Sequence, residues 1–341
     1  MNSFRRDRLS LRIKVKHFVF VVILLVAVSL PSPIQAKSIK KEVQGNTTTT
    51  IVTSNIIHTS NVGKRVFLTR IPVKLHAITN EEPDPQKIVA VPKNTPLIVQ
   101  KKLAEDKGYL VSMPHSKAKL VISHPAKLIY STKTAKLNSK EMKALRLSAD
   151  RWAKKLTNRE IKAIRYYTNN GYGKINDTLR NPHKRATSKV KTSIKQINRA
   201  IDQYQLKQPL TVFRGTTPLG LTKSLGSQSV KVGGQYHDPA YSSTTLSQMI
   251  ALGFSRSKQH VVLKINLPKG RYGAYIDPIS TNVGEREYLL HHGTKLIVTK
   301  IQKVHLTVHT VTTVEQKGKK PVRKVTNAPI NYRLVTLSLM K

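Results

Sequence analysis

The sequence contains no cysteine, and this absence limits both its stability and its chemistry. Without thiols, the 341-residue chain can form no disulfide, no thiolate metal site and no cysteine nucleophile. Glycine and proline number only 16 and 17, which excludes a collagen-like or low-complexity chain. Because 39% of the residues are hydrophobic, the chain can bury a substantial core, and its length favours two domains.

Acidic residues are scarce as well. The chain has 17 Asp and Glu against 60 Lys and Arg, a formal net charge of +43, which predicts acidic binding partners. Each carboxylate is therefore informative by its position. The 12 histidines show no HExxH-type spacing, so we predict no metal site.

The first 36 residues are typical of a secretory signal peptide. Six basic residues precede an apolar run over residues 18–30, and small residues lead to Ala36. An uncleaved membrane anchor is the competing interpretation, but this run is shorter than the ~20 residues needed to span a bilayer. We expect cleavage after Ala36, export and no stable membrane span. Removing six basic residues and one acidic residue leaves +38 on the mature chain.

Composition divides the rest of the chain into three segments. Residues 37–61 are rich in Thr, Ser, Asn and Lys, which predicts a flexible spacer. Residues 62–136 contain short β-branched runs separated by turn residues, which predicts a small all-β domain of uncertain role. In residues 137–341 the helical patterns come first and the strand patterns follow, so we predict an α+β domain.

Local signals place the elements of this last segment. Two capping boxes mark helix starts: Asn138 with Glu141, and Thr157 with Glu160. Helical patterning predicts four helices, over residues 139–155, 158–167, 175–180 and 188–204. Strand patterns follow at residues 210–213, 261–265 and 295–301, with a hairpin around Gly318.

An arginine at the end of an apolar strand is followed by glycine, at Arg214 and Gly215. A guanidinium there can hold a phosphate through two parallel hydrogen bonds, and the glycine lets a ligand approach the backbone closely. The alternative is an edge-strand arginine that leads into a turn.

Two further segments carry polar side chains at strand spacing. If residues 242–245 form a strand, Ser243 and Thr245 share a face, where their hydroxyls can orient a carboxylate or meet a ligand. If residues 284–290 form a strand, Glu285 and Glu287 also share a face, which is repulsive unless a function uses both charges. The alternatives are a solvated Ser/Thr-rich strand and ion pairs with nearby Lys or Arg.

Three segments, taken in chain order, form a more specific combination: Arg214, Ser243-Thr244-Thr245 and Glu285-Arg286-Glu287. This combination resembles the bacterial ADP-ribosyltransferase exotoxin family, particularly its arginine-specific branch with iota-type enzymatic components. Residues 167–176 are similar to the family's tyrosine-bearing helix region, and residues 267–276 to the strand and turn before its substrate-recognition loop. The family has serine where this chain has Thr245, which keeps a hydroxyl. The resemblance covers residue 138 to the C-terminus.

The resemblance implies a fold, a co-substrate and residue roles. The fold would be helices packed on a mixed, β-sandwich-like ADP-ribosyltransferase core, and the co-substrate NAD. Glu287 would stabilise the oxocarbenium character that develops at the ribose and hold its 2′-hydroxyl, and Ser243 would orient this glutamate and favour its ionised form. Glu285 would receive the incoming guanidinium. The implied NAD-binding residues are Arg214, Gly215, Tyr167, Tyr172, Asn176, Thr244, Phe254 and Arg256, with Lys258 as an alternative to Arg256 and a helix-core role as the alternative for Tyr167.

The predicted function is that of an exported mono-ADP-ribosyltransferase, a toxin that modifies an arginine of a host protein. The iota-type resemblance favours actin as this acceptor, which residues 277–284 would meet, with an apolar contact from Tyr275 or Ile279. A separate translocation component is a further expected partner, docked through residues 62–130; no specific nucleic acid is expected. Two alternatives stay open: an NAD glycohydrolase, which needs Glu287 only, and a secreted polyanion-binding surface protein with a degenerate transferase half.

Overall fold

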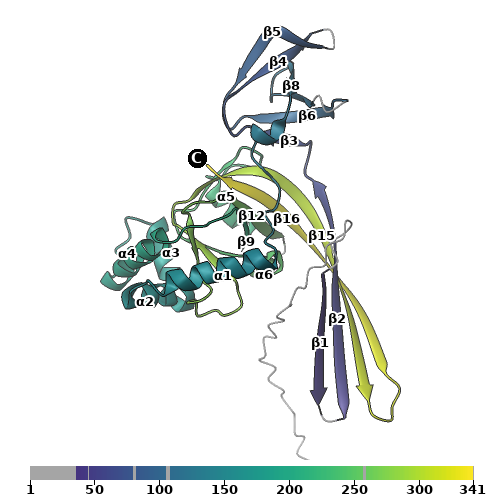
Figure 1. The fold of residues 1–341 in the computed structure, drawn as a ribbon, viewed down its shortest axis with the longest axis vertical. Helices are drawn as coiled ribbons and strands as arrows, with labels where there is room; N and C mark the ends of the chain where they lie inside the picture. The colour runs from purple at the N-terminus through teal and green to yellow at the C-terminus, as the bar shows by residue number, and fades with distance from the viewer. Residues whose placement is uncertain (1–35, 45, 80–81, 105–107, 256–258, 341) are drawn as a thin grey trace, which may run out of the picture.

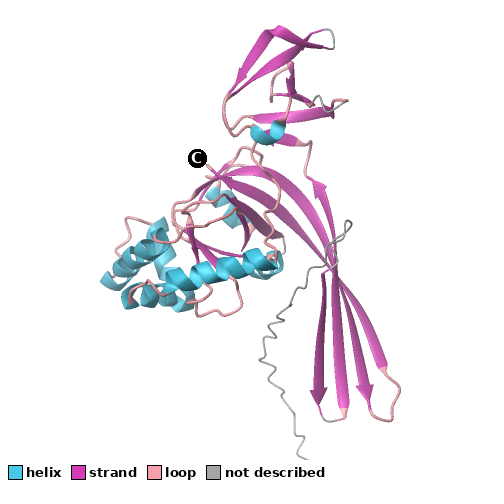
Figure 2. Cartoon of the chain, viewed as in Figure 1, coloured by secondary structure: helices cyan, strands magenta, loops and turns pink. Residues whose placement is uncertain are grey.

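The chain is mostly β and is built around two sheets (Figure 1, Figure 2). The computed structural model describes residues 36–44, 46–79, 82–104, 108–255 and 259–340. The predicted signal peptide lies outside these residues, apart from its last position. Among the described helices, none combines the length and apolar character needed to cross a bilayer.

The larger sheet has ten strands and is mixed and curled. Nine strands lie in the order β1 (Ala36–Gln44), β2 (Thr47–Asn61), β15 (Lys295–Gln316), β16 (Val322–Leu339), β12 (His260–Leu267), β9 (Leu210–Thr216), β11 (Ser242–Thr245), β14 (Glu287–Leu290) and β13 (Gly273–Tyr275). The tenth, β10 (Gln235–His237), pairs with β15. Strands β12 and β16 run parallel, and the other pairs are antiparallel.

Residues 37–61 are not a spacer, because they form β1 and β2 at the edge of this sheet. Strand β2 pairs with β15 along its whole length, from Thr47 opposite Gln316 to Asn61 opposite Gln302. Threonine is β-branched and suits a pleated strand. Because it is also polar, a threonine-rich strand has a composition similar to that of a linker. The partner strand lies near the other end of the chain, so no local pattern reveals the pairing. The predicted start of the last domain at residue 137 is therefore wrong, since residues 36–61 share its sheet.

The smaller sheet lies at one end of the molecule (Figure 1). Its strand order is β3 (Val66–Leu68), β6 (Pro96–Lys102), β7 (Tyr109–Ser112), β8 (Lys119–Ile122), β4 (Val73–Thr79) and β5 (Glu82–Val91). A hydrophobic cluster of its own lies within it, made of Phe67, Val73, Leu75, Val91, Leu97, Val111, Leu120 and Ile122. A second, small cluster joins the two sheets, because Leu68 and Tyr130 pack against Ile297 of β15.

Four of the helices follow one another between the two groups of strands. They are α1 (Ser139–Ala153), α2 (Asn158–Tyr166), α3 (Tyr172–Arg180) and α4 (Ser188–Asp202). Both predicted capping boxes are confirmed, as are the helix starts at 139, 158 and 188. A π-helical turn, Tyr167–Gly171, joins α2 to α3 without a break. Two short helices, α5 (Pro218–Ser224) and α6 (Gln248–Phe254), lie among the strands.

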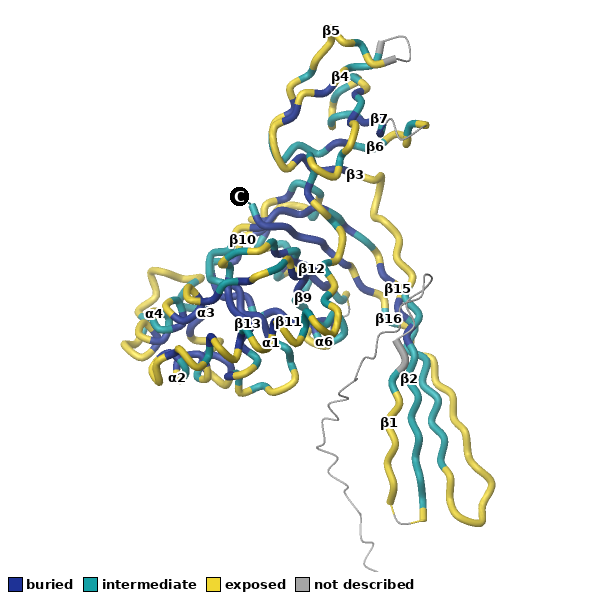
Figure 3. Tube along the Cα trace, in the orientation of Figure 1, coloured by how far each residue is buried: buried dark blue, intermediate teal, exposed yellow. Residues whose placement is uncertain are grey.

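The main core lies where these helices meet the strands of the larger sheet (Figure 3). Trp152, the only tryptophan, donates its Nε1–H to the carbonyl of Ala200 at 2.8 Å and meets the Tyr204 ring edge-on. The far end of the ribbon formed by β1, β2, β15 and β16 is exposed or half-buried instead (Figure 3).

The assignment of residues 37–61 to the sheet predicts unequal effects for two isoleucines. Ile57 packs against a cluster that includes Leu252 and Val304, whereas Ile39 is 65% exposed on β1. We expect Ile57→Ala to lower the free energy of unfolding by about 1–2 kcal/mol, below the ~2–5 kcal/mol of a fully buried isoleucine. The matched control, Ile39→Ala, should change it by less than about 0.5 kcal/mol. Urea denaturation measures both, and a spacer would leave both variants as stable as the unchanged chain.

Candidate active site

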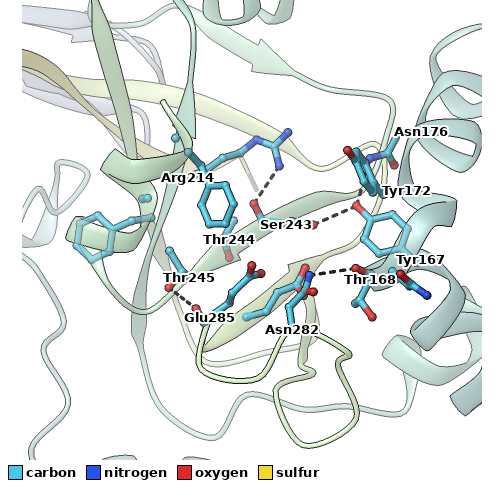
Figure 4. A pocket seen from close by; sticks show the side chains of 16 residues that line it. Tyr167, Thr168, Tyr172, Asn176, Arg214, Ser243, Thr244, Thr245, Asn282 and Glu285 are labelled. Atoms are coloured by element: carbon cyan, nitrogen blue, oxygen red, sulfur yellow. Dashed lines mark hydrogen bonds between the residues drawn. The ribbon is translucent and has the colours of Figure 1, made fainter. Parts of the chain in front are cut away.

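A pocket of about 390 Å³ lies between the helices and strands β9, β11 and β14 (Figure 4). It brings together every predicted site residue that the structure describes: Tyr167, Tyr172, Asn176, Arg214, Gly215, Ser243, Thr244, Phe254, Glu285 and Glu287. Arg256 and its alternative Lys258 lie outside the described residues. Thr245, the last residue of the Ser243-Thr244-Thr245 motif, also lines the pocket. Sequence reasoning did not single out the remaining lining residues: Thr168, Asn169, Phe213, Ala251 and Asn282.

A chain of hydroxyl and amide groups connects the helical wall of the pocket to β11. The Tyr167 hydroxyl lies 3.1 Å from Ser243 Oγ, and it accepts a hydrogen bond from Asn176 Nδ2 at 3.2 Å. Tyr167 is 1% exposed, and burial raises the pKa of its phenol, so it stays neutral. The π-helical turn begins at this tyrosine. Such turns occur mostly as local bulges at functional sites.

An ion pair attaches α3 to the segment that leads into β11. Arg180 donates from Nε and one terminal nitrogen to the two carboxylate oxygens of Asp238, at 2.9 and 2.8 Å. A bidentate pair of this kind fixes the relative orientation of the two side chains in addition to its charge attraction. Asp238 is 7% exposed, and its pKa is lowered because the bonds from Arg180 and the backbone outweigh the effect of burial. The pair therefore fixes the helix that carries Asn176 relative to Ser243.

Arg214 extends from β9 toward the pocket (Figure 4). One terminal nitrogen donates to the backbone carbonyl of Ser243 at 2.9 Å. Within the described part of the chain, no carboxylate forms an ion pair with this guanidinium. Its remaining N–H groups can hold an anionic group in the pocket.

Gly215 is required by packing rather than by an approaching ligand. A Cβ atom built on it would lie 2.0 Å from the carbonyl oxygen of Ala251 in α6. The space that a side chain would fill is occupied by helix α6, while Gly215 itself lines the pocket, so its predicted backbone contact with a ligand stays a prediction. The close approach brings Phe254, the last residue of α6, to the pocket, where it is 46% exposed.

The two glutamates reach the pocket by different routes. Strand β14 begins only at Glu287, which pairs with Thr245 of β11. Glu285 lies in the preceding turn, and Arg286 between them has a left-handed backbone with φ of 51°. The prediction that one strand presents both carboxylates on one face is therefore wrong, although both line the pocket. The Thr245 hydroxyl donates to the Glu285 carbonyl at 2.7 Å and so holds this turn against β11.

Burial decides the charge state of Glu287, whose side chain is nearly enclosed. Desolvation raises its pKa to about 7, opposed by a hydrogen bond from Ser243 and reinforced by the negative charge of Glu285. Ser280 also donates to Glu287, at 3.4 Å. The pKa of Glu285 is raised as well, chiefly by burial. Ser243 thus acts in the direction predicted from the sequence, but desolvation is larger, and Glu287 keeps its proton up to near-neutral pH.

The loop before Glu285 is fastened to the helical wall by Thr168. Its Oγ1 lies 3.0 Å from the Thr281 hydroxyl and accepts the Thr281 backbone N–H at 3.1 Å, while Asn282 Nδ2 donates to the Thr168 carbonyl at 3.0 Å. Tyr275 and Ile279 are buried, so the prediction that either supplies an exposed apolar contact is wrong. The exposed apolar side chain of this loop is Val283, at 90%.

The pocket contains groups that suit a polar, phosphate-bearing ligand. Asn176 Oδ1 is buried and, among the described residues, has no hydrogen-bond partner. An unsatisfied acceptor of this kind is costly unless a ligand or water reaches it. Arg214 supplies a cation for phosphates, and Phe254 an exposed ring for stacking. In the described ranges, no group of three or more His, Asp or Glu is arranged for a metal ion.

Comparison with known proteins gives the family. The profile of the ADP-ribosyltransferase exoenzyme family matches residues 146–321, just over half of the chain. The chain therefore belongs to this family, and the resemblance inferred from the three motifs is confirmed. The predicted enzyme class and co-substrate, ADP-ribosyl transfer from NAD, are those of the family.

Individual relatives are distant. NAD(+)--arginine ADP-ribosyltransferase EFV of Enterococcus faecalis is 26% identical over 162 residues, which are 46% of this chain and only 32% of that relative. Among solved structures, Plx2a from Paenibacillus larvae has 22% identity and a TM-score of 0.43, over 59% of this chain and 96% of its own. The Clostridium limosum C3 exoenzyme has 19% identity and a TM-score of 0.44, over 62% and 98%.

The pKa of Glu287 predicts a pH-dependent reaction rate. If this carboxylate must be ionised, kcat/KM for NAD cleavage should rise with pH through a midpoint at about 7. Ser243→Ala removes a hydrogen bond that favours the ionised form, so the midpoint should move to higher pH. Rates measured from about pH 5 to about pH 9 test this. An unchanged midpoint in the variant would contradict the role of Ser243.

Protein stability supplies a control that needs no enzymatic activity. Because the folded pKa of Glu287 lies above its unfolded value of 4.5, its contribution to stability is full below about pH 4.5 and is lost as pH rises through about 7. Glu287→Gln removes this dependence. The free energy of unfolding of the variant, relative to the unchanged chain, should therefore be higher at about pH 8 than at about pH 5.

Proposed function

We propose that the chain is an exported mono-ADP-ribosyltransferase that transfers ADP-ribose from NAD to an arginine of a host protein. One observation carries the proposal: a single pocket brings together the buried Glu287, Glu285 in the turn before β14, and Arg214. Among the described residues, this arginine has no carboxylate partner. The Enterococcus faecalis relative is named as an arginine ADP-ribosyltransferase, which supports arginine as the acceptor. The predicted signal peptide supports export.

Glu287 is the proposed catalytic carboxylate. Cleavage of the bond between nicotinamide and ribose develops positive charge on the sugar, and a fixed carboxylate nearby lowers that barrier. Only 5% of Glu287 is exposed, so its charge acts in a region of low dielectric. Ser243 and Ser280 donate to it, and Tyr167 holds Ser243. A cationic ligand beside Glu287 favours loss of its proton.

Glu285 is proposed to receive the acceptor guanidinium. It is less buried than Glu287 and lies in the turn that follows the exposed loop, where a protein side chain can enter. A carboxylate beside an arginine both positions it and favours loss of its proton as the new bond to ribose forms. For NAD itself, we propose Arg214 at the phosphates and Phe254 at the nicotinamide ring, with Arg256 or Lys258 as an additional phosphate contact.

Separate substitutions of the two glutamates test these roles. Glu287→Gln should lower both NAD hydrolysis and transfer to agmatine by about 10²- to 10³-fold. Glu285→Gln should lower transfer by about 10²-fold or more while hydrolysis changes only a few fold, because water needs no guanidinium site. Glu315→Gln, on the exposed ribbon, serves as the control and should leave both rates unchanged.

The same assay separates the alternatives. An NAD glycohydrolase would hydrolyse NAD at the same rate with or without Glu285 and would label no acceptor in either form. A degenerate polyanion-binding protein would show neither rate. Transfer that survives Glu285→Gln would contradict the proposed role of that residue.

Recognition of the protein acceptor is proposed to involve Val283. It is 90% exposed on a loop that Thr168 fastens beside the pocket, so a protein that presents an arginine to Glu285 would contact it. The iota-type resemblance favours actin as that protein. A separate translocation component remains a proposed partner for residues 62–130.

Substitution of Val283 should affect large acceptors only. We expect Val283→Asp to reduce labelling of a protein acceptor about tenfold, while transfer to agmatine and NAD hydrolysis stay unchanged. Val322→Asp is the matched control, because Val322 is 66% exposed on the distant ribbon hairpin. Labelling of purified actin and of a host lysate with radiolabelled NAD measures the effect. Equal loss with agmatine and with protein would contradict a recognition role.

A further inference from the structure

A second cavity, of about 630 Å³, is lined by residues of both sheets. Strand β3 of the smaller sheet lies next to β15 of the larger one where the two sheets meet (Figure 1). We call this cavity the junction cavity. It shares no lining residue with the active-site pocket. Its lining combines the end of β2, strand β3, residues 125–133 and Thr299, Lys300 and Ile301 of β15. All of its charged lining residues are basic, namely Lys64, Arg65, Lys133 and Lys300.

Arg65 is held on the wall formed by the smaller sheet. Its guanidinium carbon lies 5.0 Å from the centre of the Phe67 ring and 5.1 Å from that of Tyr109. The two rings meet edge-on, so they form a fixed corner around the cation. Cation–π contacts position a guanidinium without neutralising its charge. Arg65 therefore keeps N–H groups available for an anion.

Lys300 faces the junction cavity from the opposite wall. It is half-buried on β15, and its pKa is lowered by burial and then by the positive charge of Arg65. A third cation adds to the repulsion: Lys264 is 7% exposed, and burial together with Lys300 lowers its pKa to about 8. Its Nζ donates at 2.8 Å to the carbonyl of Thr132, which lines the junction cavity.

Of these cations, Lys264 is buried and Lys300 is half-buried, whereas Arg65 is exposed. Within the described residues, no carboxylate forms an ion pair with Arg65, Lys264 or Lys300. Buried charges of one sign are costly unless an opposite charge accompanies them. None of the acidic residues that the structure describes lines this cavity. An anion bound in the junction cavity would supply the counter-charge that the described residues do not give to Lys264 and Lys300.

We propose that the junction cavity binds a small molecule that carries two or more phosphate groups. Phosphate matches the flat fork of Arg65 through paired hydrogen bonds and accepts from the lysine ammonium groups as well. A single carboxylate would neutralise only one of the four lining cations, whereas several phosphates can meet both walls at once. The volume exceeds that of the active-site pocket, so a ligand of comparable size fits.

Binding there would connect the two sheets. Arg65 precedes β3 of the smaller sheet, and Lys300 belongs to β15 of the larger one, so one ligand would hold both walls. Such a ligand binds only the folded arrangement and stabilises it by mass action. The proposal does not depend on the transferase function, because the two cavities have no residue in common.

Calorimetric titration of the full chain with inorganic tripolyphosphate tests the site. Because a chain of +43 attracts polyanions over its whole surface, the control must remove the same charge elsewhere. Arg65→Gln with Lys300→Gln should weaken binding about tenfold or more. Lys319→Gln with Lys320→Gln, on the exposed ribbon hairpin, should weaken it less than about twofold at the same salt concentration. Equal weakening in both variants, or in neither, would overturn the proposal.

Two further measurements keep the outcome interpretable. Thermal unfolding without the probe checks that the variants fold; if the double variant does not, Lys300→Gln alone must still weaken binding several fold. Vesicles that carry a phosphorylated inositol lipid, compared with phosphatidylserine vesicles of equal charge, identify the source of the phosphates. If the chain binds the inositol-lipid vesicles selectively and the Arg65 and Lys300 substitutions abolish this binding, the ligand is a lipid headgroup. If the chain binds tripolyphosphate but neither kind of vesicle, the ligand is a free molecule. Binding of neither would overturn the proposal.

Discussion

The antiparallel pairing of β11 with β14 is the constraint on which the active-site pocket depends. Its register places Thr245 opposite Glu287 and Ser243 opposite Leu289, so the hydroxyl-bearing strand and the proposed catalytic carboxylate are held in one sheet. The side chains of β11 secure that register. Thr244 donates to the Tyr288 carbonyl at 2.5 Å, and Thr245 donates to the Glu285 carbonyl. A slip of one residue would turn Ser243 away from Tyr167 and remove the link to the helices.

Burial has two opposing effects on the Glu287 carboxylate. The pocket encloses Glu287 so that its charge acts strongly, and the same enclosure raises its pKa to about 7. The hydroxyls of Ser243 and Ser280 offset part of this effect, while Glu285 adds to it. The resting site therefore holds a glutamate near the midpoint of its titration, and a cationic ligand can shift it to the ionised form. Glu285 therefore influences Glu287 whatever its own role, since its negative charge raises the pKa of that carboxyl.

Local sequence signals predicted the parts of the fold that depend on neighbours in the chain. The capping boxes at Asn138 and Thr157 fixed two helix starts, and the ordered motifs found the lining of the pocket. The failures concern contacts between distant segments. The pairing of β2 with β15, the carbonyl of Ala251 against Gly215 and the anchoring of the loop by Thr168 each join residues that no short window contains. The left-handed Arg286 was missed because arginine rarely adopts that conformation.

The excess positive charge is used differently in the two cavities. In the active-site pocket, Arg214 shares the lining with Glu285 and Glu287, so a ligand must present both anionic and cationic parts, as a dinucleotide with a nicotinamide ring does. In the junction cavity, the charged lining is entirely basic, which selects for charge density rather than for a pattern of opposite charges. Net charge alone would not distinguish these sites, because both attract phosphates. The two sites differ in their carboxylates: Glu285 and Glu287 line the active-site pocket, and no described carboxylate lines the junction cavity. A carboxylate stabilises positive charge that develops in bond cleavage, so only the first lining has the group that the proposed reaction needs.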